Sequence, residues 1–299
     1  MKVASPDTND RHRVVLYVTS STDLEALLES AEAGTLTHAL VSLFHLGYDD
    51  ENNKTGPYVH LGDHRPSDPR FDELWATVKT VQGYGTKVMA SLGGAGVGDY
   101  GNLFAAYDVF YPLLCDALES YDLDGLDTDT EESGITTGNI QQLIGDLRRS
   151  FAGRAGGFLL SSAPVASALT DGGSVSSGVD YHRLLEQFDW YNLQFYGWGS
   201  LPSGSSSPPP NYTPNYEAVV AATGSANVSK LVAGVLTNPD DGNGYVSLSE
   251  LRPVLSALAG RYADFGGVMG WNYGNALGPA GTVDPAGWAA AMAASLQAS

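Results

Sequence analysis

The chain has 299 residues, an apolar fraction of 43% and a formal net charge of −19. Such an apolar fraction can fill a large core. The negative charge argues against nucleic acid and anionic membranes as partners, because both carry charge of the same sign. No run of 18 apolar residues predicts a transmembrane helix, and the single cysteine, Cys115, excludes an internal disulfide.

Short apolar, β-rich runs alternate along the chain with stretches of helical periodicity. Strands are predicted over residues 14–19, 39–46, 87–92, 125–131, 157–165, 190–196, 231–237 and 267–273. Helices are predicted over residues 22–33, 71–84, 103–121, 138–151, 181–187, 216–226, 247–262 and 288–297. We expect Pro112 to kink or restart the third helix, and Ser247 with Glu250 to form a capping box before the seventh.

Strands that alternate with helices favour parallel pairing through right-handed crossovers. Eight such units in a chain of this length predict a closed (β/α)8 TIM barrel, an α/β fold, as a single domain. The alternative, an open doubly wound sheet, would bring a glycine-rich loop after the first strand, and none is present. We assign residues 13–299 to the barrel and 1–12 to a flexible arm. Residues 47–68 and 199–214 are predicted to be loops on the active-site side.

The fourth predicted strand carries the most informative motif, DGLDTDTE at residues 124–131. Alternate side chains of a strand share one face, so Asp127, Asp129 and Glu131 would line up roughly 6.6 Å apart. Carboxylates this close cannot all ionise cheaply, and we expect at least one to keep its proton near neutral pH. A carboxylic acid beside a carboxylate is what glycosidic bond cleavage requires.

A calcium loop is one alternative for this acidic cluster. The EF-hand pattern needs Gly at its sixth and Glu at its twelfth position, but counting from Asp127 these positions hold Glu132 and Gly138. A solvated acidic loop is the other alternative, and Thr128 and Thr130 disfavour it because β-branched residues favour a strand. The sequence therefore predicts catalytic carboxylates here, and no histidine cluster suggests a metal site.

Polar and aromatic residues end several other predicted strands, at the end of a barrel where active sites are built. Alternation in the sixth strand places Asn192, Gln194 and Tyr196 on one face. The eighth strand carries Trp271 near its end, which is either a stacking surface for a sugar ring or core filling. The third strand ends in Gly93 and Gly94, which allow a ligand or a neighbouring strand to approach the backbone closely.

These elements together resemble glycoside hydrolase family 18, which contains chitinases and endo-β-N-acetylglucosaminidases. Residues 124–131 match its Asp-x-x-Asp-x-Asp-x-Glu signature and residues 91–94 its Ser-x-Gly-Gly signature. Gln194, Tyr196 and Trp271 match further family positions in the same order. The chain looks most like the single-domain fungal-type endo-β-N-acetylglucosaminidases, for example in THALVSLFHL (37–46) and GGVMGWNY (266–273). It departs from them at Asn272, where an acid is usual, and at Thr128 and Thr130, where larger apolar residues are usual.

The resemblance implies a retaining mechanism in which the sugar's own 2-acetamido oxygen attacks the anomeric carbon. Glu131 would protonate the leaving oxygen and then activate water, while Asp129 would hold the acetamido N–H and share a proton with Asp127. Tyr196 would orient the acetamido oxygen. The remaining implied substrate contacts are Tyr17, His45, Gly93, Gly94, Asn192, Gln194, Trp198, Asn238 and Trp271. For His45, a structural role is the alternative.

Three functions fit this resemblance. The leading hypothesis is an endo-β-N-acetylglucosaminidase that cuts the chitobiose core of N-linked glycans. A chitinase is the second, and a non-catalytic, lectin-like barrel is the third, which the intact Glu131 opposes. We expect an N-acetylglucosamine-containing glycan as partner, a monomer, and no cofactor or metal. Sequons at Asn53, Asn211 and Asn227 favour secretion, although the amino terminus lacks the apolar region of a signal peptide.

Overall fold

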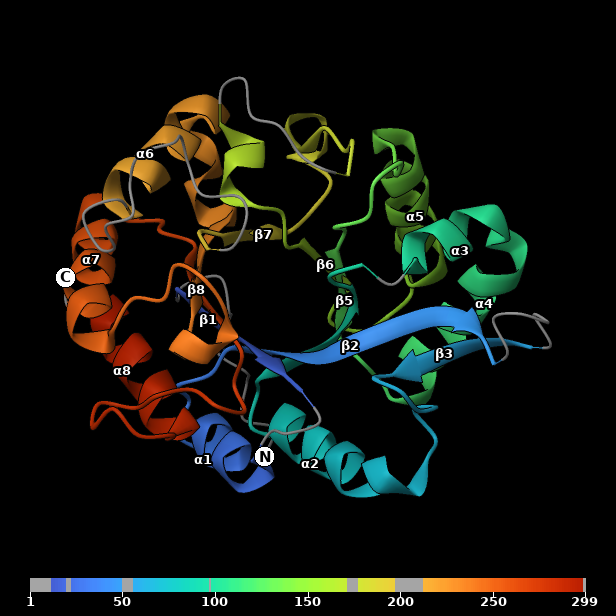
Figure 1. Ribbon diagram of the computed structural model, residues 1–299, viewed down its shortest axis with the longest axis horizontal. Helices are drawn as coiled ribbons and strands as arrows, with labels where there is room; N and C mark the ends of the chain where they lie inside the picture. The colour runs from blue at the N-terminus through green and yellow to red at the C-terminus, as the bar shows by residue number, and fades with distance from the viewer. Residues whose placement is uncertain are drawn as a thin grey trace.

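The computed structural model describes residues 12–19, 23–49, 56–96, 98–170, 177–196 and 212–297. Within these ranges, eight parallel strands close into a barrel, because β1 pairs with both β2 and β9. Figure 1 shows this ring of strands enclosed by helices, which confirms the predicted (β/α)8 architecture. The barrel strands are β1 (Arg13–Val18), β2 (His38–Tyr48), β4 (Lys87–Gly93), β5 (Gly125–Asp129), β6 (Leu159–Ser162), β7 (Trp190–Gln194), β8 (Leu231–Leu236) and β9 (Gly267–Trp271).

The helices cover the outside of the barrel, and none of those described is long and apolar enough to cross a membrane. Their bounds are α1 (Leu24–Glu32), α2 (Asp72–Gly83), α3 (Asp99–Ala105), α4 (Tyr107–Ser120), α5 (Thr137–Ser150), α6 (Tyr212–Thr223), α7 (Leu248–Arg261) and α8 (Pro285–Gln297). The capping box of Ser247 and Glu250 at the start of α7 is confirmed.

Several predicted boundaries were wrong. The predicted helix 103–121 is two helices, and the break lies at Ala106, whose φ of −142° and ψ of 58° are not helical. Pro112 lies inside α4, which continues through it. The predicted helix 181–187 is only a short 3-10 turn, Tyr181–Leu184. After β2, the predicted loop 47–68 contains a further strand, β3 (Pro57–Leu61), which pairs antiparallel with β2 outside the barrel (Figure 1).

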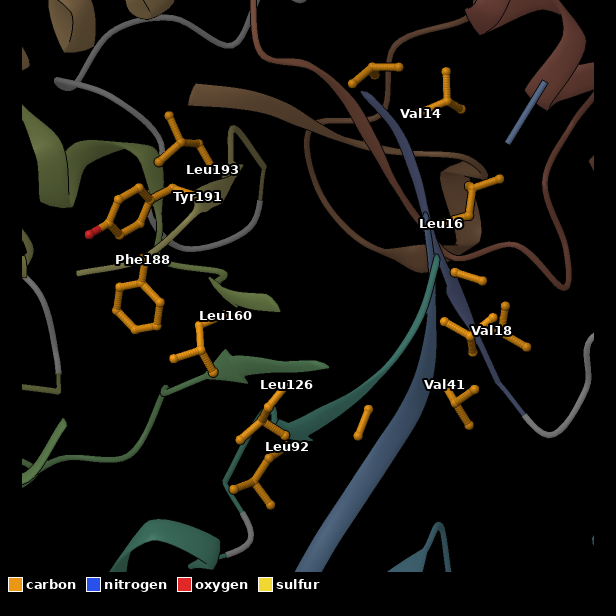
Figure 2. Close-up of a cluster of buried hydrophobic side chains, with 14 of the residues drawn as sticks. Val14, Leu16, Val18, Val41, Leu92, Leu126, Leu160, Phe188, Tyr191 and Leu193 are labelled. Carbon is orange, nitrogen blue, oxygen red and sulfur yellow. The ribbon is translucent and has the colours of Figure 1, made fainter. Parts of the chain in front are cut away.

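Alternation along each strand divides the core into two layers. Val14, Leu16 and Val18 of β1 face outward and pack between the strands and the helices, in the large cluster of Figure 2. Val15 and Tyr17 face inward and join a smaller cluster that fills the barrel, together with Leu40, Met89, Ala163, Trp190, Val232 and Met269. The interior is therefore packed with side chains, and space for a ligand remains only towards its ends.

Candidate active site

A cavity of about 770 Å³ opens at the carboxyl ends of the barrel strands. Residues from all eight barrel strands, or from the segments that follow them, supply most of its lining. From β1 to β9 these are Tyr17, Leu43, His45, Gly93, Gly94, Ala95, Asp129, Thr130, Glu131, Ala163, Pro164, Val165, Gln194, Tyr196, Asp241, Gly242, Asn243 and Trp271. The structure thus brings together nine of the predicted site residues: Tyr17, His45, Gly93, Gly94, Asp129, Glu131, Gln194, Tyr196 and Trp271.

Asp127 lies below the cavity and is completely buried. One carboxylate oxygen accepts hydrogen bonds from Ser161 Oγ (2.6 Å) and Asn192 Nδ2 (3.0 Å). The other accepts from Tyr17 OH (2.9 Å) and Ser91 Oγ (3.0 Å). Burial raises the pKa of Asp127, and these hydrogen bonds oppose the rise because they favour the charged form. Asp127 is therefore equipped to hold a negative charge beneath the cavity floor.

Asp129 and Glu131 lie side by side, because the side-chain amide of Gln194 contacts both carboxyl groups. Burial holds the pKa of Asp129 well above its usual value, and the charges of Glu131 and Asp127 raise it further. Gln194 Nε2 bridges the pair, with Asp129 Oδ1 and Glu131 Oε1 both at 3.2 Å. The raised pKa of Asp129 supports the expectation that one member of the acidic row keeps its proton, and the sharing expected between Asp129 and Asp127 stays a prediction.

Gly93 and Gly94 allow β4 to lie against the end of β5. A Cβ on Gly93 would collide with the carbonyl oxygen of Asp129, and its φ of 105° favours glycine. The Gly94 N–H donates to the same oxygen at 2.9 Å, and a Cβ there would lie 2.8 Å from Leu43 Cδ1. Of the two alternatives for these glycines, the structure shows close approach of a neighbouring strand, and this contact fixes the backbone of Asp129.

Glu131 does not continue the strand, because β5 ends at Asp129. It stands in the following loop and is exposed to solvent at the mouth of the cavity. The next residue, Glu132, anchors this loop. Its carboxylate accepts hydrogen bonds from the backbone N–H groups of Tyr100 and Gly101, both at 2.9 Å, in the first turn of α3. A negative charge at a helix amino terminus is favourable, so Glu132 ties the loop to α3.

Glu132→Ala should lower the free energy of unfolding by about 1 kcal/mol, the usual cost of a lost helix cap. Urea denaturation measures this difference. Glu73→Ala removes an exposed charge from α2 and should change stability by less than about 0.5 kcal/mol. Equal effects of the two substitutions would contradict the anchoring role.

Two predicted substrate contacts have other surroundings, and a third lies outside the described residues. Asn192 is completely buried and accepts a hydrogen bond from Trp190 Nε1 (3.0 Å) while it donates to Asp127. Asn238 holds the turn after β8, where it accepts from Asp240 N (3.0 Å) and donates to Asn275 O (2.8 Å). Neither side chain lines the cavity. Trp198 lies outside the described residues.

His45 lines the cavity from β2, and its ring is held in place. Its Nδ1 lies 3.0 Å from Asp99 Oδ2, so Nδ1 donates to this buried carboxylate. Asp99 also accepts from the backbone N–H of Leu46 at 2.6 Å. The structure therefore shows a structural role for His45, and because its ring also lines the cavity, the substrate contact stays a prediction.

Asp241 is the main site residue that the sequence did not reveal. One of its carboxylate oxygens accepts from Asn272 Nδ2 (3.2 Å) and Asn275 Nδ2 (2.7 Å), and the other accepts from the Asn272 backbone N–H (3.3 Å). Asp241 thus fixes the backbone that immediately follows Trp271, whose ring meets that of Tyr17 edge-on at 5.2 Å. The contact also accounts for Asn272, because an acid there would face the carboxylate of Asp241.

Within the described residues, no three His, Cys, Asp or Glu side chains are arranged to hold a metal ion. The expectation of a site without metal or cofactor stays a prediction. The chemistry that the cavity offers is carried by its carboxyl pair, its amide bridge and its aromatic walls.

Comparisons with known proteins agree with this geometry. Residues 13–239 match the family model of glycosyl hydrolases family 18. A fungal endo-β-N-acetylglucosaminidase of that family superposes with a TM-score of 0.77 and 34% identity, over 95% of this chain and 98% of the other. A chitinase from Aspergillus fumigatus superposes with a TM-score of 0.76 and 32% identity, over 96% of this chain and 100% of the other. Chitinase 1 of Rhizopus niveus is 31% identical over 65% of this chain, which spans only 38% of that relative's length.

Proposed function

Because the chain belongs to glycosyl hydrolase family 18, we propose that it hydrolyses β-1,4 bonds at N-acetylglucosamine with retention of configuration. Its substrate is the chitobiose core of N-linked glycans, which makes the protein an endo-β-N-acetylglucosaminidase. The observation that carries the proposal is the pair of Asp129 and Glu131, bridged by the amide of Gln194 in one cavity with Trp271 and Tyr196.

The proton held by the carboxyl pair accounts for the first step. When it resides on Glu131, Asp129 is a carboxylate that accepts the substrate's acetamido N–H. The acetamido oxygen attacks the anomeric carbon, the bond to the leaving oxygen breaks, and Glu131 transfers its proton to that oxygen. Glu131 then takes a proton from water, which attacks the oxazolinium ion from the face that the leaving group vacated. Two inversions at one carbon retain the configuration.

The surrounding residues stabilise the positive charge that develops on the sugar. Asp129 is the nearest carboxylate to the reacting ring in this arrangement, and Asp127 adds a second negative charge beneath it. The low-dielectric surroundings of both buried groups strengthen this attraction. Trp271 presents an aromatic face for the C–H groups of the sugar, and the phenol of Tyr196 orients the acetamido oxygen.

The N-glycan substrate is supported by the fungal endo-β-N-acetylglucosaminidase, whose chain is almost fully covered at 34% identity. Chitin is the second candidate substrate. It is supported by the Aspergillus fumigatus chitinase at 32% identity and by the Rhizopus niveus chitinase at 31%. Both substrates present N-acetylglucosamine to the same carboxyl pair, so they differ only in the sugars beyond the cleaved bond.

Incubation with a high-mannose glycoprotein and, separately, with chitin oligomers distinguishes the two substrates. The proposal predicts release of intact glycan, detected by mass spectrometry, with one N-acetylglucosamine left on the protein. The Glu131→Gln variant, purified in the same way, controls for contaminating enzymes. Turnover of chitin oligomers without glycan release would establish the chitinase instead, and turnover of neither would contradict the proposed function.

Asp241→Asn should raise KM about tenfold with a smaller effect on kcat. The amide cannot accept as many hydrogen bonds as the carboxylate, and losing a bond to a charged group costs about 1.5–3 kcal/mol. The turn that follows Trp271 then loses part of its contact with residue 241 and positions the ring less firmly. Steady-state kinetics measure the split between KM and kcat. Asp240→Asn, a change of the same kind at the exposed neighbour, is the matched control. Equal KM values for both variants would contradict the positioning role.

A further inference from the structure

A second cavity, of about 660 Å³, lies at the opposite end of the barrel, where the strands begin. The first residues of five strands line it: Arg13, His38, Lys87, Leu159 and Trp190. On β1, Arg13, Val15 and Tyr17 share the inward face. Arg13 lines this cavity and Tyr17 lines the active-site cavity, and the fully buried Val15 lies between them. The two cavities are therefore separate.

The lining of this cavity is basic, in contrast to the chain as a whole. It includes three of the chain's 15 Lys and Arg residues and two of its six His, but only two of its 34 Asp and Glu. We call it the basic cavity, defined by Arg13, Lys87, Lys230, His12 and His38. A concave surface with an excess of one sign of charge attracts ions of the other sign.

Two of its cations already have carboxylate partners. Lys87 Nζ lies 3.1 Å from Asp124 Oδ1, and Lys230 Nζ lies 3.2 Å from Glu186 Oε2. The carboxylate of Asp189 in the lining is likewise paired, with Arg148 at 2.9 Å.

Arg13 differs from these cations. Among the described residues, no carboxylate lies within ion-pair distance of its guanidinium, and its one hydrogen-bond partner is the Ser229 carbonyl oxygen at 2.7 Å. The guanidinium lies over the ring of Trp190, 4.9 Å from the centroid. Arg13 is half-buried. Burial lowers its pKa, and the charge of Asp189 in the same lining opposes the decrease. Asp189 is itself paired with Arg148, so an anion directly beside the guanidinium of Arg13 would be stabilising.

The pKa of His38 responds to the charges of this region. Burial lowers the pKa of His38 to about 3, and the positive charges of Arg13 and Lys87 contribute to the decrease. The ring is therefore neutral at physiological pH. It packs 4.7 Å from the ring of Trp190, and its Nδ1 is 2.8 Å from Thr37 Oγ1.

We propose that the basic cavity binds a small oxyanion, of the carboxylate or phosphate class, through the guanidinium of Arg13. A guanidinium carries N–H donors in a planar fork that matches two oxygens of one anion, and in Arg13 most of these donors are unused. Trp190 holds the plane of this fork in place. The site is separate from the proposed active site and stabilises the fold when occupied.

The test is thermal denaturation of the full chain with increasing sodium phosphate or sodium citrate, with ionic strength held constant by sodium chloride. Because a ligand of the native state stabilises it by mass action, Tm should rise with concentration, by about 5–10 °C at a hundredfold excess over Kd. A response to phosphate alone or to citrate alone identifies the class of anion. A Tm that stays the same when phosphate or citrate replaces chloride at constant ionic strength would overturn the proposal.

Substitutions test whether Arg13 is the residue that binds the anion. Arg13→Gln should abolish the rise in Tm, and Arg13→Lys, which keeps the charge but loses the fork, should reduce the affinity at least tenfold. Arg65→Gln, at an exposed arginine paired with Asp49, should respond like the parent chain. If Arg13→Gln does not fold, the affinity of Arg13→Lys relative to the parent chain still tests the role of the guanidinium. An Arg13→Lys variant with unchanged affinity would show that no fork is used, and would overturn the assignment to Arg13.

The chain's own carboxylates offer a competing occupant, because Asp7 and Asp10 precede His12 closely in the sequence. The parent chain and a variant with Asp7→Asn and Asp10→Asn should show the same rise in Tm when phosphate or citrate is added. A rise that occurs only in the variant would mean that the chain fills its own cavity, and would contradict binding of a free anion.

Discussion

Replacing Glu131 by Gln should lower kcat by a factor of about 10²–10⁴ or more, with KM changed much less. Gln has nearly the same size and can still accept the hydrogen bond from Gln194, so the fold of the loop is kept. It cannot donate a proton to the leaving oxygen or take one from water, and both steps of the proposed reaction need this transfer. Initial rates of sugar release measure the loss.

Glu73→Gln is the matched control, because it removes the same charge at an exposed position on α2. It should leave kcat within a factor of two or so, as surface substitutions usually do. Turnover by Glu131→Gln equal to that of the control would show that another group supplies the proton. The Asp129–Glu131 pair would then lose its proposed role.

Asp129→Asn should also cost at least about a hundredfold in kcat while substrate binding is retained. The neutral amide can accept the acetamido N–H through its oxygen, but it carries no charge to stabilise the oxazolinium ion. Isothermal titration with a non-hydrolysable N-acetylglucosamine oligomer measures the binding. A loss of binding as large as the loss of kcat would mean that Asp129 shapes the cavity and does not act in the chemistry.

Asp129→Asn should also change how the stability of the protein depends on pH. The folded-state pKa of Asp129 is raised well above 3.8, so the folded state binds this proton more tightly than the unfolded state. The resulting stabilisation is complete below about pH 3.8 and is lost as the pH rises through the folded-state pKa. Asn does not titrate, so the stability of Asp129→Asn relative to the parent should increase from pH 4 to pH 8. Urea denaturation across this range measures it, and a constant difference would contradict the raised pKa.

Much of the fold and part of the site could be predicted from local patterns. The eight strands follow from short apolar, β-rich runs between helical stretches. The row of Asp127 and Asp129 follows from a period of two, because alternate side chains of a strand share one face. The inward positions of Asn192 and Gln194 follow from the same period. Alternation gives the face of a side chain but not its depth. Asn192 therefore lies one layer too deep to reach a ligand, where it supports Asp127.

Other features depend on contacts that no local pattern records. Glu131 leaves the strand because its loop is tied to α3 through Glu132, whose partners lie 31 and 32 residues away. Asp241 meets Asn272 and Asn275 across 31 and 34 residues, and only the folded barrel brings these turns together. The basic cavity was missed for the same reason, because its residues stand singly at the starts of different strands.

The most direct test of the proposed mechanism is a crystal structure of the Glu131→Gln variant with a bound N-acetylglucosamine oligosaccharide. We predict that one sugar ring lies on Trp271, with its acetamido N–H on Asp129 and its acetamido oxygen on Tyr196. The glycosidic oxygen should lie beside the substituted side chain. A sugar whose acetamido group points away from Asp129, or that binds outside this cavity, would contradict the mechanism.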